Sequence, residues 1–462
     1  MDMILKNRKA LLQWAITILI PLLVLLIPIN ETITTTLKLF LCITAFIIFV
    51  VAFDFFNTAW PAILLPTLYL ICGVAPANVA FGPWTGTTVW MILGAFVLTT
   101  ALEDCGLLRR IALACVRACG GSFTGTMFGL ILAGYVLAWL TFCNHYVVMA
   151  MLSYAVCVAM GTGRSRESAL LLFAGQIGAG TVQIFTFEAA YNSMMQGSLA
   201  TISDTLTVPW YVLPVYNLPG LFITLIFFFI LTKVFKTKNI KLKGAKAYFD
   251  DEYKKLGKVS SKERKAAILL ALLMIYLVTT PLHNLPLAYG FMLIPYLMFI
   301  PGVKVADSNV ITKVNWSVIF FIAACLSIGQ VAMYLNLGQI LSDILTPVLN
   351  NMGVIPSLLL IYFTGTLANL ILTPAAMVTT LTAPLTQIAM DLGISHWPYL
   401  MTMIYSTDSV FLPHEIGFLL IFYGFGLMSM KDFVMLNLFK MGIFVILFVA
   451  LQIPYWYLIG LL

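Results

Sequence analysis

Long apolar stretches constrain the fold of this chain more than any other feature. Seven of them have the length, or nearly the length, of a helix that crosses a bilayer: Leu11–Pro28, Leu37–Phe56, Thr88–Leu102, Leu218–Phe235, Ala266–Thr280, Asn315–Leu335 and Phe433–Leu458. Of the 462 residues, 61% are hydrophobic and only 9% are charged. A water-soluble domain cannot bury so much apolar surface, so we predict an all-α polytopic membrane protein.

Lysine and arginine gather between the apolar stretches. Twelve of the 25 lie between Lys233 and Lys265, in a polar connector, and all the others except Lys38 cluster at Lys6–Lys9, Arg109–Arg117, Arg164–Arg166, Lys304–Lys313 and Lys431–Lys440. If the N-terminus is cytoplasmic and six spans precede the connector, these clusters all face the cytoplasm. We therefore expect about eleven spans, an extracellular or periplasmic C-terminus, and a place in the plasma (inner) membrane. Because the basic residues are segregated in this way, the net charge of +7 does not indicate a nucleic-acid partner.

Several features recur in two halves of the chain at offsets of 225 to 230 residues. An apolar span is followed in each half by a segment with a polar tip and apolar arms, which is typical of a re-entrant hairpin, and then by a broken span. An odd number of spans per half would invert the second copy. We expect the N-terminal segment and first span in 1–34, the first repeat in 35–236, the basic cytoplasmic connector in 237–265 and the second repeat in 266–462. The hairpins are expected at about 120–160 and 350–390, and the broken helices at about 167–205 and 397–428.

Two glutamates, Glu188 and Glu415, lie in the broken segments, 227 residues apart. A charged side chain at the bilayer centre costs roughly 2.5–3.5 kcal/mol on insertion scales, so such residues indicate function. A matched pair within an inverted repeat indicates a transport site between the repeats. Since desolvation disfavours the charged form of a carboxyl group, each Glu is a candidate proton carrier. The structural alternative is that each caps the end of a broken helix or pairs with a neighbouring His.

The order and spacing of these features resemble the divalent-anion/sodium symporter family, from about Leu37 to the end of the chain. The segment Trp90–Arg110 is similar to the family's fourth helix, and Leu412-Pro413 with Tyr423–Gly426 and Met430–Asp432 is similar to its tenth helix and the following turn. The resemblance implies an elevator-type secondary active transporter that works as a homodimer in the lipid bilayer. Its substrate would be a small anion such as a dicarboxylate, citrate or sulfate.

The family carries Ser-Asn-Thr at each hairpin tip, where it binds substrate carboxylates and helps to hold sodium. Here only the tip asparagines match, with other residues around them. By the resemblance, the expected substrate-binding residues are Cys143, Asn144, His145, Ala368, Asn369 and Asn192. A protonated His145 can meet an anion, and its alternative role is packing. The asparagines can also cap the hairpin tips.

Ion coupling is expected at Glu188, Glu415 and Asp408. Each Glu replaces a residue whose backbone carbonyl holds sodium in the family, so we expect coupling to protons or an exchange mechanism. The alternative for Asp408 is a structural pair with Lys440 or a hydroxyl, and we expect Lys440 itself to extend to the cytoplasmic interface. If sodium is used instead, its candidate positions are Asn144, Glu188, Asn369 and Glu415.

We therefore expect secondary active transport of a di- or tricarboxylate. The alternatives are a sodium-coupled symporter of a dicarboxylate or sulfate and, from another class, a gated channel or a nutrient sensor on the same fold. The sequence has no His-Glu-x-x-His, no Gly-x-Ser-x-Gly and no phosphate loop, so we expect no enzyme activity. We also expect no cofactor and no metal site other than a possible sodium site.

Overall fold

The structure is a computed structural model. It describes residues 2–29, 33–53, 55–57, 59–142, 145–161, 163–203, 205–240, 245–337, 340, 343, 347, 352–370, 372–413 and 415–462. The described residues are mainly helical and contain no strand, so the prediction of an all-α protein is confirmed.

The chain divides into two compact units. Unit 1 comprises Met1–Val89, Ser193–Thr207 and Asn315–Met403, and unit 2 comprises Trp90–Asn192, Val208–Val314 and Ile404–Leu462. Three helices run across these divisions: α5 (Thr87–Asp104), α10 (Ala189–Leu199) and α22 (Trp397–Thr407). Each unit therefore takes segments from both halves of the sequence.

In unit 1, α18 packs against α2, α3 and α21. The helices of this unit are α1 (Asp2–Leu25), α2 (Thr35–Ala52), α3 (Ala59–Ile71), α4 (Ala77–Ala80), η1 (Gly82–Trp84), α18 (Trp316–Tyr334), α20 (Val354–Ala368) and α21 (Pro374–Asp391). Buried polar contacts accompany the apolar core. The hydroxyls of Thr44 and Tyr69 lie 2.6 Å apart, and Ser327 Oγ donates to Ala80 O over 2.6 Å.

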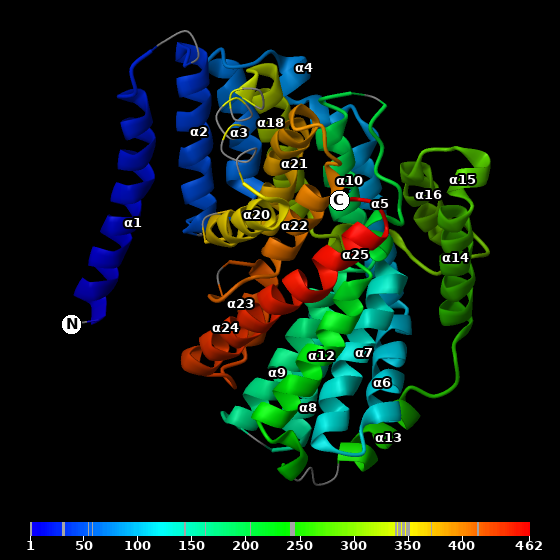
Figure 1. The fold of residues 1–462 in the computed structure, drawn as a ribbon. Coiled ribbons are helices and arrows are strands. Elements are labelled where there is room, and N and C mark those ends of the chain that lie inside the picture. The colour runs from blue at the N-terminus through cyan, green and yellow to red at the C-terminus, as the bar shows by residue number, and fades with distance from the viewer. Residues whose placement is uncertain are drawn as a thin grey trace. The chain divides into compact units, whose positions relative to one another are not determined.

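In unit 2, α7 packs against both α6 and α9, and α9 also contacts α8 (Figure 1). The helices of its first part are α6 (Leu107–Cys119), α7 (Phe123–Thr141), α8 (Tyr146–Ala159), α9 (Arg166–Ala179), η2 (Thr181–Ile184), α11 (Val212–Tyr216), α12 (Pro219–Val234) and η3 (Thr237–Asn239). The remaining helices are α13 (Ala245–Lys255), α14 (Ser261–Val278), α15 (Thr280–His283), α16 (Leu287–Leu293), η4 (Ile294–Phe299), α17 (Ser308–Lys313), α23 (Gly417–Gly424), α24 (Met430–Leu447), η5 (Phe448–Gln452) and α25 (Ile453–Leu458).

Serine and threonine begin several of these helices. The side chains of Ser122, Ser165 and Ser429 accept hydrogen bonds from backbone N–H groups in the first turns of α7, α9 and α24. Thr373 does the same for α21, where Pro374 is the first helical residue. Such caps satisfy backbone donors that the helix itself leaves free.

Glycines allow the helices around α7 to approach closely. A Cβ on Gly129 would lie 2.9 Å from Val116 Cα in α6, and a Cβ on Gly134 would lie 2.0 Å from Gly178 O in α9. Both distances are shorter than van der Waals contact. The backbones of α6, α7 and α9 can therefore touch only where these side chains are absent.

Four helical segments among the described residues are long and apolar enough to cross a membrane: Phe123–Thr141, Arg166–Leu199, Trp316–Tyr334 and Met430–Leu458. The pair Thr87–Asp104 and Leu107–Cys119, bent by 69°, makes a fifth if it is one span. Seven more apolar helices have 10 to 17 residues. The chain is thus a multi-pass membrane protein, and the number of eleven spans stays a prediction.

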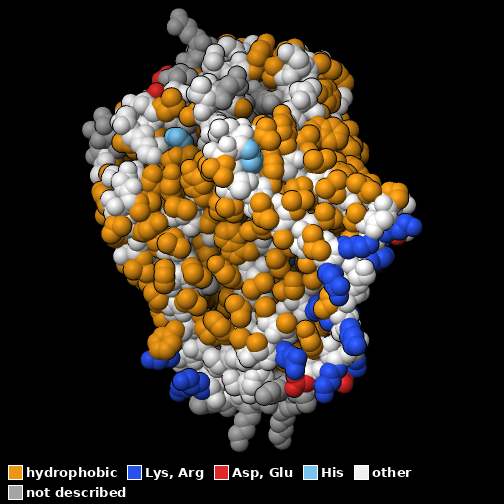
Figure 2. Space-filling view, turned by 90° about the vertical axis from the view of Figure 1, so that its right-hand side faces the viewer, with side chains coloured by type: hydrophobic (Ala, Val, Ile, Leu, Met, Phe, Trp, Pro, Cys, Tyr) orange, Lys and Arg blue, Asp and Glu red, His pale blue; other side chains and the backbone are white. Residues whose placement is uncertain are grey.

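The outward face of α14 is apolar. Ile268, Leu272, Ile275 and Val278, which are three or four residues apart, are all exposed. Figure 2 shows hydrophobic side chains over a broad area of one face, with Lys and Arg side chains below it and along its right-hand edge. An exposed apolar stripe of this kind suits contact with lipid.

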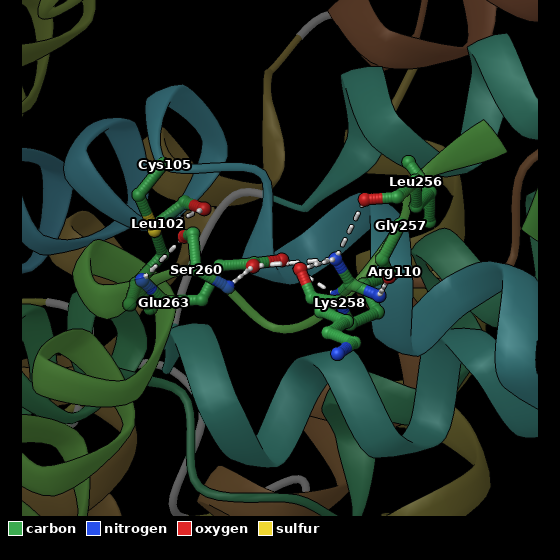
Figure 3. A network of polar contacts seen from close by, with 8 residues as sticks. All are labelled: Leu102, Cys105, Arg110, Leu256, Gly257, Lys258, Ser260 and Glu263. Atoms are coloured by element: carbon green, nitrogen blue, oxygen red, sulfur yellow. Dashed lines mark hydrogen bonds and ion pairs between the residues drawn. The ribbon is translucent and has the colours of Figure 1, made fainter. Parts of the chain in front are cut away.

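The connector docks on α6 through a buried ion pair (Figure 3). Arg110 Nε lies 2.6 Å from Glu263 Oε1, and the Arg110 guanidinium also donates to the carbonyls of Leu256, Gly257 and Lys258. Glu263 forms a capping box with Ser260 at the start of α14. The hydrogen bond from Arg110 lowers the pKa of Glu263, so this carboxyl stays ionised at neutral pH.

Candidate functional site

Helices α9 and α22 both end, within unit 2, close to a single hydrogen bond. Helix α9 ends at Ala179 and is followed by the turn that begins at Thr181, and α22 ends at Thr407, directly before Asp408. Thr181 Oγ1 donates to Asp408 Oδ1 over 3.1 Å. The breaks in the two helices therefore meet inside the same unit.

Lys440, on α24, completes this contact. Its Nζ lies 3.0 Å from Asp408 Oδ2 and donates to Thr181 Oγ1 over 3.3 Å. The Lys440 side chain is only 2% exposed, and that of Asp408 is 11% exposed. The prediction that Lys440 extends to the cytoplasmic interface is wrong. The ammonium stays inside because a carboxylate and a hydroxyl replace part of its hydration shell there.

A second polar contact joins α24 to α9. Gln176 Nε2 donates to Asn437 Oδ1 over 2.7 Å, and Asn437 Nδ2 donates to the carbonyl of Phe433 within α24. Gln176 precedes Thr181 by five residues, and Asn437 precedes Lys440 by three. This amide pair therefore holds α24 and α9 together about one turn from the ion pair.

Glu188 is buried directly before α10. Its Oε2 accepts a hydrogen bond from the backbone N–H of Tyr191 over 2.5 Å, in the first turn of that helix. The next residue, Ala189, donates its N–H to Phe142 O over 2.6 Å. The structure therefore shows the capping role for Glu188 and places the end of α7 beside it.

Glu415 is buried just before α23 but does not cap it. Its Oε1 accepts hydrogen bonds from the backbone N–H groups of Phe411, at 3.1 Å, and Leu412, at 2.7 Å. Its Oε2 is buried and has no hydrogen-bond partner in the part of the chain that the structure describes. Lys440 is close enough to act on Glu415 electrostatically. Glu415 thus keeps one oxygen available inside the protein.

His145, at the start of α8, lies over the end of α9. Its Nε2 lies 3.0 Å from Gly178 O, and because a carbonyl can only accept, Nε2 carries the hydrogen. Its Nδ1 is buried without a hydrogen-bond partner among the described residues.

The next residue, Tyr146, joins three elements of unit 2. Its hydroxyl donates to Gln183 Oε1 over 2.8 Å, and its ring stacks on Phe418 of α23 with the centroids 4.3 Å apart. Gln183 Nε2 is buried and unpaired within the described ranges. The residue at the start of α8, the break after α9 and the start of α23 thus come together here.

A family model described as citrate transporter matches residues 43–406, which is more than half of the chain. The chain belongs to the citrate transporter family. It is therefore a secondary transporter and not an enzyme. Membership of the divalent-anion/sodium symporter family stays a prediction. No curated protein matches the chain.

Solved transporter structures share the fold. The YdaH transporter of Alcanivorax borkumensis has a TM-score of 0.58 and 17% sequence identity, over 83% of this chain and 88% of that chain. MtrF of Neisseria gonorrhoeae, from a class of antimetabolite efflux pumps, has a TM-score of 0.55 and 13% identity, over 79% and 80%. At these identities the likeness concerns the fold alone.

The remaining predicted site residues of this citrate transporter family member differ in what they offer. Asn192 Nδ2 donates to the carbonyls of Val208 and Pro209 at 3.1 and 3.2 Å, so its donors hold a loop of the protein. In unit 1, Asn369 is buried and caps the end of α20, and Ala368 is half-buried as its last residue. Cys143, Asn144 and His414 lie outside the described residues.

Sequence reasoning missed three residues of the unit 2 site: Thr181, Tyr146 and Gln183. Thr181 was detectable, because it precedes Asp408 by the same 227 residues that separate Glu188 from Glu415. The expected position of Lys440 at the cytoplasmic interface is wrong, whereas the alternative of a structural pair between Asp408 and Lys440 is confirmed. For Tyr146 and Gln183, neutral polar residues in apolar segments, the sequence contains no distinguishing signal. We refer below to Thr181, Asp408 and Lys440 together as the Lys440 triad.

Unit 1 contains a small cavity of a different character. Its volume is about 30 Å³, and it is lined mainly by aliphatic and aromatic side chains of α2, α3, α18 and α21. No group of three or more His, Cys, Asp or Glu side chains suited to a metal ion occurs within the described residues. The buried charged groups described above belong to unit 2, and none of them is among this cavity's lining residues.

Proposed function

We propose that this protein is a secondary active transporter of a di- or tricarboxylate such as citrate, coupled to protons or working by exchange. Membership of the citrate transporter family supports the substrate class. The resemblance to the divalent-anion/sodium symporter family, given above, points to the same class.

The observation that carries the proposal is the balance of charge among the ionisable side chains inside unit 2. Apart from the Arg110–Glu263 pair, the described residues of unit 2 hold the buried carboxyl groups of Glu188 and Glu415, and the 11% exposed carboxyl of Asp408, which pairs with the buried ammonium of Lys440. With all four ionised, their net charge is −2. Buried charges without partners are costly, so such a set favours the uptake of protons or cations.

Glu415 is the proposed proton carrier. Glu188 uses its carboxylate to cap α10, whereas Glu415 Oε2 has no hydrogen-bond partner among the described residues. A proton on Oε2 would remove the uncompensated charge and leave the two backbone hydrogen bonds to Oε1 in place. Protonation therefore changes the charge of the site with little change in its geometry.

The anion would be bound beside the break in α9. Gln183 Nε2 is a donor without a partner in the described part of the chain, and His145 Nδ1 becomes a donor when the imidazole is protonated. Gln183 is hydrogen-bonded to the hydroxyl of Tyr146, and His145 directly precedes Tyr146 in the sequence. Binding of a carboxylate would satisfy polar groups that are otherwise buried and unpaired.

A sodium-coupled symporter is the second candidate. Sodium needs several oxygens that converge on one point, and the oxygens of Thr181 and Asp408 are already engaged by Lys440. This arrangement favours protons over sodium. We also propose an elevator mechanism and a homodimer, which rest on the resemblance. The proposed cytoplasmic N-terminus and the place in the plasma (inner) membrane rest on the distribution of Lys and Arg.

Uptake of labelled citrate into proteoliposomes tests the proposal. With an acidic exterior, citrate should accumulate above its external concentration, and replacing sodium by choline should have no effect. Preloading with unlabelled citrate tests the exchange version. Strict sodium dependence without a response to pH would favour the sodium symporter. Uptake that only equilibrates would indicate a channel, and citrate binding without any flux a sensor.

A further inference from the structure

The Lys440 triad lies where two half-helices end. The last carbonyl groups of a helix have no partner within the helix and give that end a partial negative charge. Helix α9 ends two residues before Thr181, and α22 ends one residue before Asp408. In transporters with broken helices, such ends commonly coordinate the coupling cation.

We propose that the Lys440 ammonium occupies a monovalent-cation site formed by Asp408, Thr181 and the ends of α9 and α22. The charge of a coupling sodium ion is thus supplied by the protein itself. This inference extends the proposed function, because it gives a reason why transport would not need sodium. It also predicts that removal of the ammonium opens the site to a sodium ion.

The contacts of the triad have the chemistry of a cation site. Nζ lies within 3.0 Å of a carboxylate oxygen and 3.3 Å of a hydroxyl oxygen, and that hydroxyl is hydrogen-bonded to the same carboxylate. These are hard oxygen ligands, and one of them carries a full negative charge. The three side chains come from three separate segments of the chain. Their contacts are therefore not merely the cap of a single helix.

The position of the lysine supports the same reading. Lys440 lies on α24, which is separate from both helices that end at the triad. The Gln176–Asn437 hydrogen bond of 2.7 Å holds α24 against α9. The stem of the side chain is buried and the ammonium is at its inner end. A shorter side chain at position 440 would leave a space lined by the oxygens of Thr181 and Asp408.

Purified protein in detergent tests the proposal by thermal unfolding in sodium chloride or choline chloride. We expect the same Tm for the wild type in both salts. Lys440→Ala should have a lowered Tm in choline, and sodium should raise it in a saturable manner, because an ion that binds only the native state stabilises it. Lys440→Met is the matched control: its side chain fills the space without charge, so its Tm should be low in both salts.

The double variant Asp408→Asn/Lys440→Ala checks the role of the carboxylate. It should fold in both salts and show no response to sodium. An equally low Tm of Lys440→Ala in both salts, or its failure to fold in sodium when the double variant folds, would overturn the proposal. So would saturable stabilisation of the wild type by sodium. No step of this experiment measures transport, so its outcome is independent of whether citrate is carried.

Discussion

Thr181 donates a hydrogen bond of 3.1 Å to Asp408, a residue 227 positions further along the chain. The same number of residues separates Glu188 from Glu415. If this offset relates two copies of an inverted repeat, then Thr181 and Asp408 are equivalent residues in contact. Equivalent residues can touch only near the axis that relates the copies, so the Lys440 triad would mark that axis.

Glu415→Gln should abolish proton-driven accumulation of citrate, while citrate still binds. Glutamine keeps the acceptor for the backbone N–H groups of Phe411 and Leu412 but cannot carry a titrating proton. Uptake under an imposed pH gradient and citrate-induced thermal shifts would measure the two effects separately.

Glu188→Gln provides the comparison for that variant. Its amide oxygen can still accept from the N–H of Tyr191, so we expect a loss of stability of about 1 kcal/mol or less, as for a weakened helix cap. Proton-driven uptake should persist at a reduced rate. If Glu188→Gln abolishes accumulation and Glu415→Gln does not, the two roles must be exchanged.

Arg110→Ala should destabilise the protein by about 3–5 kcal/mol, because removal of one partner leaves the other charge buried and unpaired. Glu252→Gln is the matched control. It breaks two ion pairs at the surface, with Arg109 at 3.3 Å and with Lys255 at 2.7 Å, and should cost much less than Arg110→Ala because solvent screens such pairs. Chemical unfolding of the purified variants would measure both. Equal effects would mean that the connector is not held through Arg110.

The stability that Glu263 contributes should depend on pH in a definite direction. Its pKa is lowered in the folded protein, chiefly by the hydrogen bond from Arg110. A carboxyl group with a lowered pKa stabilises the fold above its ordinary pKa of 4.5, and this contribution is lost as the pH falls through the folded value. The difference in Tm between wild type and Glu263→Gln should therefore be full at pH 7 and shrink below about pH 4.5. A constant difference would contradict the assignment.

Gly134→Ala should destabilise unit 2 and reduce transport. The new Cβ would lie 2.0 Å from Gly178 O, so α7 and α9 would have to separate, at a cost of about 1–3 kcal/mol. Gly178 lies three residues before Thr181, so the shift would reach the Lys440 triad. Gly121→Ala is the control, because nothing lies within 4 Å of the added atom. Unchanged Tm and uptake in Gly134→Ala would show that these helices adjust freely.

The orientation can be tested with one native and one introduced cysteine. Cys72, just after α3, is exposed, and Lys254 is exposed on α13 in the connector. Lys254→Cys in a Cys72→Ala background should react with an impermeant maleimide only from the cytoplasm. Native Cys72 should react only from the outside. Reaction of both from one side would require a different number of spans before the connector.

The sequence by itself determined that the chain is a helical membrane transporter. Apolar stretches of bilayer length leave no soluble alternative, because buried apolar area scales with length and composition and needs no knowledge of contacts. Glu188 and Glu415 were also found from the sequence alone. An acidic residue inside an apolar stretch is costly in any fold, so its presence indicates a role before its partners are known.

Only the tertiary structure decided what these groups touch. Glu188 caps a helix and Glu415 has one oxygen without a hydrogen-bond partner among the described residues, although the two occupy matching places in the sequence. The environment of Lys440 depended on the direction in which its side chain points from α24, either to the interface or toward Asp408. The apolar residues that surround Lys440 in the sequence are the same for either direction, so they do not distinguish between the two. The choice between them depends on a carboxylate that comes close only after α9, α22 and α24 have packed together.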